Sequence, residues 1–206
     1  MNLWEEYVVP PLVSMLCSTK PVRYQREKVV PKAKGEVLEV GFGSGHNLPY
    51  YNASNVSRIF ALEPSRGMRK RAADAVAASA IAVEFLDLPG EEIPLEDKAV
   101  DTVLITYTMC TIPDVMKALA GMRRVLKPGG EMIFCEHGLA PDANIQKWQK
   151  RIEPFWKPIG GGCHLTRSIP HLINSAGFEI TELDQMYLPS TPQWAGYNYW
   201  GTAKPV

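Results

Sequence analysis

The segment with the clearest chemical signature is residues 36–46, where an apolar, strand-like run leads directly into three alternating glycines. Gly41, Gly43 and Gly45 carry no Cβ atom, so the chain can turn sharply there and a ligand can lie against bare backbone. Glu39 stands two positions before the first of these glycines. A carboxylate at that point would repel a pyrophosphate, but it suits a ligand that carries an ammonium and a sulfonium group.

Three further features narrow the chemical class of the ligand. His46 occupies the position at which a dinucleotide-binding fingerprint has its third glycine. Asn47 and Leu48 are expected to begin a helix whose first amide groups point back at the ligand. Glu63 follows the glycines by about 20 residues, the spacing at which an acid binds ribose hydroxyls. A ligand-free turn and a solvated acid are the alternatives, but the combination favours a nucleoside.

A second group of reactive residues lies between residues 137 and 170, a glycine-rich and aromatic stretch that suits a flap closing over an apolar substrate. His137 and His164 could act as a general base or stabilise a thiolate. The alternative for each is a hydrogen-bonded histidine without a chemical role. Cys163 has the chemistry of a nucleophile, although a direct transfer reaction requires none. Arg167 could pair with a substrate carboxylate, but anchoring of the flap is the favoured interpretation.

These residues need a framework, and strand-like runs alternate with helix-like runs along residues 36–136. The alternation predicts an α/β fold with a doubly wound, seven-stranded, mostly parallel sheet and a C-terminal antiparallel hairpin. Ligands bind beyond the carboxyl ends of such strands, where Thr106, Tyr107, Met109 and Cys110 are expected. The expected strands span residues 37–40, 57–62, 82–86, 100–105, 131–136, 178–188 and 196–205, and the expected helices span residues 68–80 and 115–126.

The remaining segments complete one domain over residues 1–206, a length that suits a single core. Residues 1–33 carry apolar positions at helical spacing and are expected to form a helical cap. We expect this cap to be broken at Pro10-Pro11 and to continue in a second helix over residues 22–30. Packing alone, a lid over a substrate pocket and a surface that touches a membrane are all compatible with it. Further along, Lys127-Pro128-Gly129-Gly130 is expected to stop a helix through a left-handed glycine.

The motifs resemble those of the class I S-adenosylmethionine (SAM) methyltransferases. The glycine loop is similar to motif I of that family, the run from Gly90 to Leu95 to its adenine-binding loop, and R-x-L-K-P-G-G at residues 124–130 to a later turn. Pro89 departs from the family pattern, which often has an aspartate there. G-C-x-L-T-R at residues 162–167 is similar to the methyltransferase-like 7 group of membrane-associated alkyl thiol methyltransferases, which has soluble bacterial relatives.

The resemblance implies SAM as the cofactor and S-adenosylhomocysteine as the product. Its motifs, together with the residue types, predict two sets of binding residues beside the catalytic candidates His137 and His164. The predicted cofactor-binding residues are Glu39, Gly41, Phe42, Gly43, Gly45, Asn47, Glu63, Pro64, Gly90, Glu91, Thr106 and Tyr107. The predicted substrate-binding residues are Tyr7, Met109, Trp148, Trp156, Cys163, Arg167 and Trp194.

The expected reaction is methyl transfer to a small, fairly apolar acceptor. A thiol or another soft nucleophile is the first choice, because a thiol is partly ionised at neutral pH and needs little help from a base. An N- or O-methyltransferase acting on a phospholipid headgroup or a quinone precursor is the alternative, and a non-catalytic SAM-binding module is another. A nucleic-acid substrate is disfavoured, because 22 basic residues balance 22 acidic ones and Thr106–Met109 replaces the usual catalytic tetrad.

The cysteine spacing and the apolar content narrow the class of protein further. Cys17, Cys110, Cys135 and Cys163 are widely separated and form no C-x-x-C pair, so the sequence predicts neither a metal site nor a disulfide framework. No apolar run approaches about 18 residues, and acids precede the short apolar stretch at the N-terminus. A soluble, cytoplasmic enzyme is therefore expected; membrane association is possible but not expected. The oligomeric state stays open.

Overall fold

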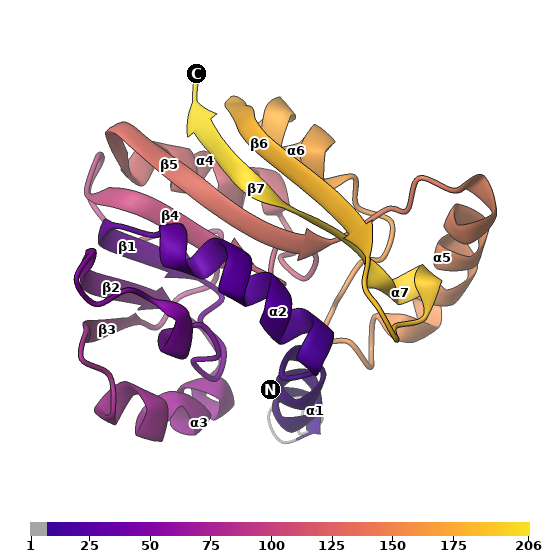
Figure 1. Cartoon of the computed structure of the whole chain (residues 1–206), viewed down its shortest axis with the longest axis horizontal. Helices are drawn as coiled ribbons and strands as arrows, with labels where there is room; N and C mark the ends of the chain where they lie inside the picture. Colours follow the sequence, from indigo (N-terminus) through magenta and orange to yellow (C-terminus); the bar gives the residue numbers. More distant parts are fainter. Residues whose placement is uncertain (1–7) are drawn as a thin grey trace.

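The computed structural model describes residues 8–206, and its centre is a twisted sheet (Figure 1). The strands are β1 (Gly35–Val40), β2 (Val56–Leu62), β3 (Ala82–Leu86), β4 (Val100–Thr106), β5 (Leu126–His137), β6 (Phe178–Tyr187) and β7 (Tyr197–Pro205). Their order is β3-β2-β1-β4-β5-β7-β6. Neighbours from β3 to β5 run parallel, whereas β7 runs antiparallel to both β5 and β6. The predicted fold class is confirmed.

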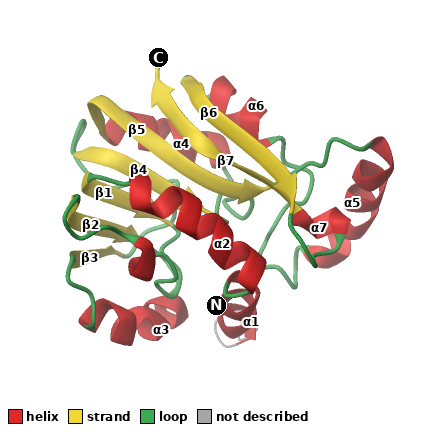
Figure 2. Cartoon of the chain, in the orientation of Figure 1, coloured by secondary structure: helices red, strands yellow, loops and turns green. Residues whose placement is uncertain are grey.

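Helices cover both faces of the sheet, so the fold has three layers (Figures 1 and 2). In the view of Figure 1, α2 crosses in front of the strands and α4 and α6 lie behind them, whereas α5 and α7 project beyond the end of the β6–β7 pair. The helices are α1 (Val9–Cys17), α2 (Lys20–Val29), α3 (Arg66–Ala77), α4 (Val115–Val125), α5 (Ala143–Trp156), α6 (Ile169–Ser175) and α7 (Gln193–Gly196).

The central strand β1 shows why its sequence is almost continuously apolar. Val37 packs on one face with Val29 of α2 and Ala72 of α3, and all three are fully or almost fully buried. Leu38 points to the opposite face and packs in the cluster that contains Leu119 of α4. Successive side chains alternate between faces, and here both faces are covered by helices. The strand is therefore held rigidly, and the glycine loop begins from a fixed point.

The first helix differs from its prediction, because Pro10 and Pro11 do not break it. The helix begins at Val9, so both prolines lie in its first turn, where their missing N–H groups cost no hydrogen bond. The break comes at Ser18-Thr19, where Thr19 is extended with a ψ of 149°. The hydroxyls of these two residues donate to carbonyl groups in the last turn of α1, at 2.8 and 2.9 Å.

The predicted helix after the glycine loop is wrong as well. Only a single 3₁₀ turn, Leu48–Tyr50, follows Asn47. Pro49 removes one backbone donor from this turn, and Tyr51 is already extended, with a φ of −67° and a ψ of 140°. The phenol of Tyr51 is buried and donates to Glu39 at 2.7 Å, so this contact draws the chain inward where a helix would have continued along the surface.

Two further segments depart from the expected outline. Helix α4 ends at Val125 because Leu126 is extended and begins β5, so Gly129, with a φ of 80°, does not stop the helix. The predicted flap, residues 137–170, is only partly loop, since α5 occupies its middle. Within the described part of the chain, no helix combines the length and the apolar character that crossing a bilayer demands.

Candidate active site

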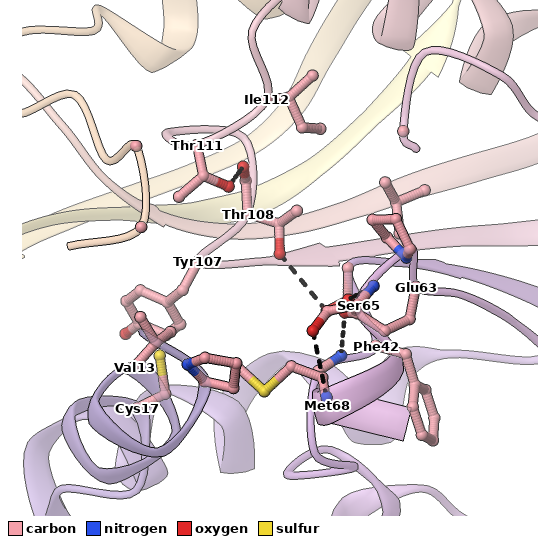
Figure 3. Close-up of a pocket in the computed structure, with 18 of the residues that line it drawn as sticks. Val13, Cys17, Phe42, Glu63, Ser65, Met68, Tyr107, Thr108, Thr111 and Ile112 are labelled. Carbon is pink, nitrogen blue, oxygen red and sulfur yellow. Dashed lines mark hydrogen bonds between the residues drawn. The ribbon is translucent and has the colours of Figure 1, made fainter. Parts of the chain in front are cut away.

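A cavity of about 840 Å³ lies at the carboxyl ends of β1, β2 and β4. Because β1 continues toward β2 and β4 continues toward β5, the loops that follow these two adjacent strands diverge and leave a crevice between them. Figure 2 shows these loops gathered between the strand ends and α1. Helix α1 and residues 157–162 cover the crevice from outside. Figure 3 shows Val13 and Cys17 of α1 facing the loop from Tyr107 to Ile112.

The glycine loop forms the floor of the cavity. Gly41 has a φ of 75°, and a Cβ atom on it would stand only 2.1 Å from Oγ1 of Thr108, so no larger residue fits. Gly43 has a φ of 59°, but a Cβ atom there would meet no protein atom nearer than 4.0 Å. Gly43 lines the cavity, and the space beside it is open for a ligand. Gly45 does not line the cavity but packs against Leu48 instead.

Glu63 connects the glycine loop to the start of α3. Its two carboxylate oxygens accept hydrogen bonds from the backbone N–H groups of Gly43 and Ser65, both at 2.8 Å. Burial raises the pKa of Glu63, and these two hydrogen bonds act in the opposite direction. Each carboxylate oxygen can accept more than one hydrogen bond, so acceptor capacity remains for hydroxyl groups in the cavity. Pro64, Gly90 and Glu91 line the same end of the cavity.

A buried polar network lies beside the glycine loop. Glu39 accepts hydrogen bonds from Nδ2 of Asn47 at 2.8 Å and from the phenol of Tyr51 at 2.7 Å. Burial raises the pKa of Glu39 to about 7. Asn47 also donates to Oγ1 of Thr106 at 3.0 Å. Asn47 and Thr106 line the cavity, whereas Glu39 lies behind them and does not. Both N–H groups of the Asn47 amide are therefore used as donors, and its Oδ1 accepts a hydrogen bond from Arg26. The network thus fixes the position of the Asn47 side chain.

Arg26 of α2 completes this network, and sequence reasoning missed it. Its Nη1 donates to Oδ1 of Asn47 and to Oγ1 of Thr106, both at 2.7 Å. Its guanidinium carbon lies 5.2 Å from the ring centre of Tyr107, and the residue lines the cavity. Although the side chain is buried, its Nε has no hydrogen-bond partner among the described residues. A buried cation with a free donor beside a cavity is suited to an anionic ligand group.

The loop after β4 forms the wall opposite the glycine loop. Tyr107 lines the cavity, as expected from its place directly after β4. Its φ is 54°, a conformation that few non-glycine residues adopt. Glu136 of β5 holds this loop, because its Oε1 accepts the N–H groups of Thr108 and Met109 at 2.8 and 2.9 Å. Burial raises the pKa of Glu136 to about 7. Met109 itself is fully buried and does not line the cavity.

Helix α1 closes the cavity from the side of the glycine loop. The hydroxyl of Ser14 lies 2.9 Å from that of Ser44, and Nε2 of His46 lies 3.2 Å from the Ser14 hydroxyl and 3.1 Å from the Ser14 carbonyl oxygen. Burial and the nearby Arg26 charge lower the pKa of His46. These contacts place α1 directly over the glycine loop. Of the predicted substrate-binding residues, Tyr7 lies outside the described residues.

Three residues of the predicted flap come together beside the cavity. Nε2 of His137 lies 2.8 Å from Sγ of Cys163, and Nε1 of Trp156 donates to the same sulfur at 3.2 Å. A hydrogen bond from Cys110 lowers the pKa of the Cys163 thiol to about 4, and His137 acts in the same direction. Trp156 also packs edge-on against Trp194, with ring centres 5.4 Å apart. None of these side chains lines the cavity, although Thr111 and Gly162, next to the two cysteines, do.

The other predicted residues of this region lie elsewhere. His164 faces Glu153, with Nδ1 3.4 Å from a carboxylate oxygen, and does not line the cavity. Trp148 is 55% exposed on α5. Arg167 donates to the carbonyl oxygen of Met109 and, at 2.7 Å, to that of Ile112, so it ties the flap to the loop after β4. The structure therefore gives Arg167 an anchoring position.

Comparison with known proteins identifies the family to which this chain belongs. Residues 38–134 match the family model of a methyltransferase domain. Human thiol S-methyltransferase TMT1B is 32% identical over 190 residues, which cover 87% of this chain and 77% of that protein. Human thiol S-methyltransferase TMT1A is 29% identical over 163 residues, which cover 77% of this chain and 66% of that protein.

A solved structure shows the same fold. The crystal structure of the [4+2]-cyclase SpnF superposes with a TM-score of 0.71 at 17% identity, covering 99% of this chain and 94% of SpnF. At that identity the likeness concerns the fold alone. The glycine loop and the acid after β2 stand at the crevice where such a fold binds its nucleotide. The sheet order, the site and the sequence kinship agree, and the chain belongs to the class I SAM-dependent methyltransferases, in the family that includes the thiol S-methyltransferases.

Proposed function

We propose that this methyltransferase transfers the methyl group of SAM to a small, apolar thiol. The observation that carries the proposal is the absence of a carboxylate at one end of the cavity. Among the described residues that line it, the acids are Glu63 and Glu91, and both lie at the end assigned to the nucleoside. The histidine that lines it, His46, has its Nε2 engaged with Ser14 and Ser44. A thiol with a pKa near 8.5 is partly ionised at neutral pH, whereas an alcohol or a protonated amine requires a positioned base. Kinship with thiol S-methyltransferases supports the same acceptor.

The residues present fit SAM, which supplies the activated methyl group. Glu63 keeps acceptor capacity for the ribose hydroxyls, and Gly90 and Glu91 offer backbone groups to the adenine. The open space beside Gly43 admits a ligand against the backbone. The unpartnered Nε of Arg26 fits the carboxylate of the methionine moiety, because a buried guanidinium binds a carboxylate through charge-assisted hydrogen bonds.

The acceptor end of the cavity is assigned to the apolar side of α1. Val9 and Val13 line it, together with Ile112 from the loop after β4. A Cβ atom on Gly161 would lie 3.2 Å from Cγ1 of Val9 and 3.4 Å from Cγ2 of Val13, so this glycine lets residues 157–162 close tightly against the helix. The enclosure excludes water and orients the two reactants, and orientation alone lowers a barrier by up to about 7–11 kcal/mol in favourable cases.

The direct test is release of S-adenosylhomocysteine from purified protein supplied with SAM and a panel of acceptors. The panel contains aliphatic and aryl thiols, catechol, a quinone precursor and phosphatidylethanolamine vesicles. Turnover of the thiols, with none of the oxygen or nitrogen acceptors used, is the expected result. Turnover of vesicles or phenols without thiols would contradict the proposal, and SAM binding without any turnover would favour a non-catalytic module.

A pair of variants on α1 tests the assignment of the acceptor end. Val13→Asp places a carboxylate in the apolar wall, and it should lower kcat/KM for apolar thiols by roughly 10-fold or more, because burying an unpaired charge is costly. The affinity for SAM should change little. Met15→Asp is the matched control, since Met15 is 61% exposed on the same helix. Equal losses in both variants would mean that the helix was only destabilised.

A further inference from the structure

Three potential metal ligands converge from distant parts of the chain, just behind the cavity wall. Cys110 lies in the loop after β4, His137 ends β5, and Cys163 lies after α5. The two sulfur atoms and a ring nitrogen of His137 all lie within 4.8 Å of one another. Cys110 is 1% exposed and Cys163 5% exposed, so the thiols are shielded from bulk solvent. The proposed SAM contacts use none of the three side chains.

The donor set matches one kind of ion. Two thiolates and an imidazole suit Zn²⁺, which prefers sulfur and nitrogen ligands in a tetrahedral arrangement. Structural zinc sites have four protein ligands, whereas zinc sites that act on substrates have three and keep one position open. We propose that Cys110, His137 and Cys163 bind a zinc ion and that its fourth position accepts the sulfur atom of the acceptor thiol.

The backbone around the cluster is already fixed, which favours a preformed site. The N–H of His164 donates to the carbonyl oxygen of Cys110 at 2.9 Å, so the two cysteine segments are joined by a main-chain hydrogen bond. His137 is paired with Asn198 in the antiparallel ladder between β5 and β7. The ligands therefore need only small side-chain adjustments to surround an ion, and little conformational entropy is lost on binding.

A second observation near the cluster favours a cation. Glu136, immediately before His137, is fully buried, and its Oε2 has no hydrogen-bond partner among the described residues. Its other oxygen accepts the N–H groups of Thr108 and Met109, the two residues that directly precede Cys110. A buried carboxylate oxygen without a partner is costly, and a cation held by the neighbouring Cys110 and His137 would offset part of that cost.

The position of the cluster connects it to the proposed reaction. Thr111 and Gly162 line the cavity, and each is the direct chain neighbour of one of the cysteines. The role of the ion, unlike its binding, rests on the proposed thiol acceptor. On coordination the acceptor thiol releases its proton to solvent and is held as a thiolate at neutral pH. Its sulfur forms a bond to the methyl carbon, the bond from that carbon to the sulfonium sulfur breaks, S-adenosylhomocysteine leaves, and the neutral thioether dissociates from the ion.

Metal content tests the site without any assay of turnover. Protein purified under reducing conditions should contain about one zinc ion per chain, as measured by inductively coupled plasma mass spectrometry. After its removal, titration with Zn²⁺ should restore that ratio, and Co²⁺ should give the visible absorption of a thiolate-bound, tetrahedral ion. Cys110→Ser and Cys163→Ser should each lose the stoichiometric metal. Cys135→Ala, which removes a buried cysteine outside the cluster, should keep it, and circular dichroism shows that each variant is folded.

An assay of thiol methylation then distinguishes a failure of the zinc site from a failure of the proposed function. Loss of thiol methylation on zinc removal, with recovery on zinc addition and unchanged SAM affinity, supports both parts of the inference. Folded, reduced protein that binds no Zn²⁺ yet methylates thiols overturns the site and leaves the proposed function standing. Stoichiometric zinc with thiol turnover that survives its removal overturns the role of the ion. Stoichiometric zinc in a protein that methylates no thiol supports the site and refutes the proposed acceptor.

Discussion

At the scale of the residue, Glu63 illustrates how one carboxylate organises two loops. It accepts the N–H of Gly43 from the glycine loop and the N–H of Ser65 at the start of α3. Both hydrogen bonds fix backbone next to the cavity before any ligand arrives. Binding of ribose hydroxyls to the same carboxylate therefore requires little rearrangement, and affinity is gained through preorganisation.

Replacement of this carboxylate should be costly for the cofactor. Glu63→Ala removes hydrogen bonds to a charged group, each of which contributes about 1.5–3 kcal/mol, so the Kd for SAM should rise by roughly 10-fold or more. Calorimetric titration measures the effect. Glu84→Ala is the control, because Glu84 lies on the neighbouring strand β3 with its side chain 56% exposed. Unchanged affinity in Glu63→Ala would refute the assignment of the ribose contact.

Gly43 permits a different test, because a Cβ atom there would meet no protein atom nearer than 4.0 Å. Gly43→Val introduces a residue with a φ of 59°, which costs about 1–2 kcal/mol, so the protein should fold with a modestly lower Tm. Its side chain would occupy the space reserved for the ligand, and SAM binding should be lost in the same titration. Retention of SAM binding would mean that the cofactor does not lie against this loop.

Glu39 should make stability depend on pH. Burial raises the pKa of Glu39 to about 7 in the folded protein from an ordinary value of 4.5, so the folded state binds the proton more tightly. The free energy of unfolding should therefore fall as the pH rises from about 4.5 to about 7, by about 3 kcal/mol from this residue. Glu39→Gln removes that contribution. Urea denaturation at pH 5 and pH 8 should show a smaller loss in the variant, and an equal loss in both proteins would contradict the argument.

Sequence reasoning located residues whose signal is local and missed those whose signal is spatial. The glycine loop is contiguous, and Glu63 stands at a regular spacing from it. Arg26 gave no such signal, since it is one of several cations along α2 and only its burial distinguishes it. The cluster of Cys110, His137 and Cys163 was equally hidden, because its members come from three segments that only the sheet brings together.

At the scale of the element, the flap is held to the sheet by Arg167. Its guanidinium donates to two carbonyl oxygens of the loop after β4, those of Met109 and Ile112. One side chain thus couples a segment that covers the site to a segment that lines it. The elements themselves were mostly predictable from hydrophobic periodicity, and two of the errors came at prolines, where Pro49 shortened a helix and Pro10-Pro11 began one.

Loss of this tie should affect the acceptor more than the cofactor. Arg167→Ala should raise KM for a thiol acceptor several-fold and increase the rate of limited proteolysis after α5, while the Kd for SAM changes little. Arg167→Lys should rescue only part of the effect, because an ammonium lacks the forked geometry that reaches two carbonyl groups. Arg151→Ala, on the exposed surface of α5, is the control. Equal changes in acceptor KM and SAM affinity would point to a general loss of structure.

At the scale of the whole molecule, the fold was predictable but does not define the reaction. The alternation of strands and helices predicted the observed fold class, a seven-stranded, mostly parallel sheet with antiparallel C-terminal strands. Yet SpnF, a cyclase, superposes over almost the entire chain. The sheet supplies a crevice and fixed strand ends, and the chemistry depends on the side chains that α1, the flap and the loop after β4 place around that crevice.

The strand order also has a consequence for how the protein assembles. Residues 197–205 follow all other strands in the chain, yet β7 lies between β5 and β6. Until β7 is in place, β6 has no partner and β5 presents an unpaired edge, which is the kind of surface that templates aggregation. Pairing across this sequence distance is intrinsically slow. During synthesis, Glu136 and His137 therefore acquire their final surroundings only when β7 enters the sheet, so the newly made chain passes through a vulnerable interval before its active site exists.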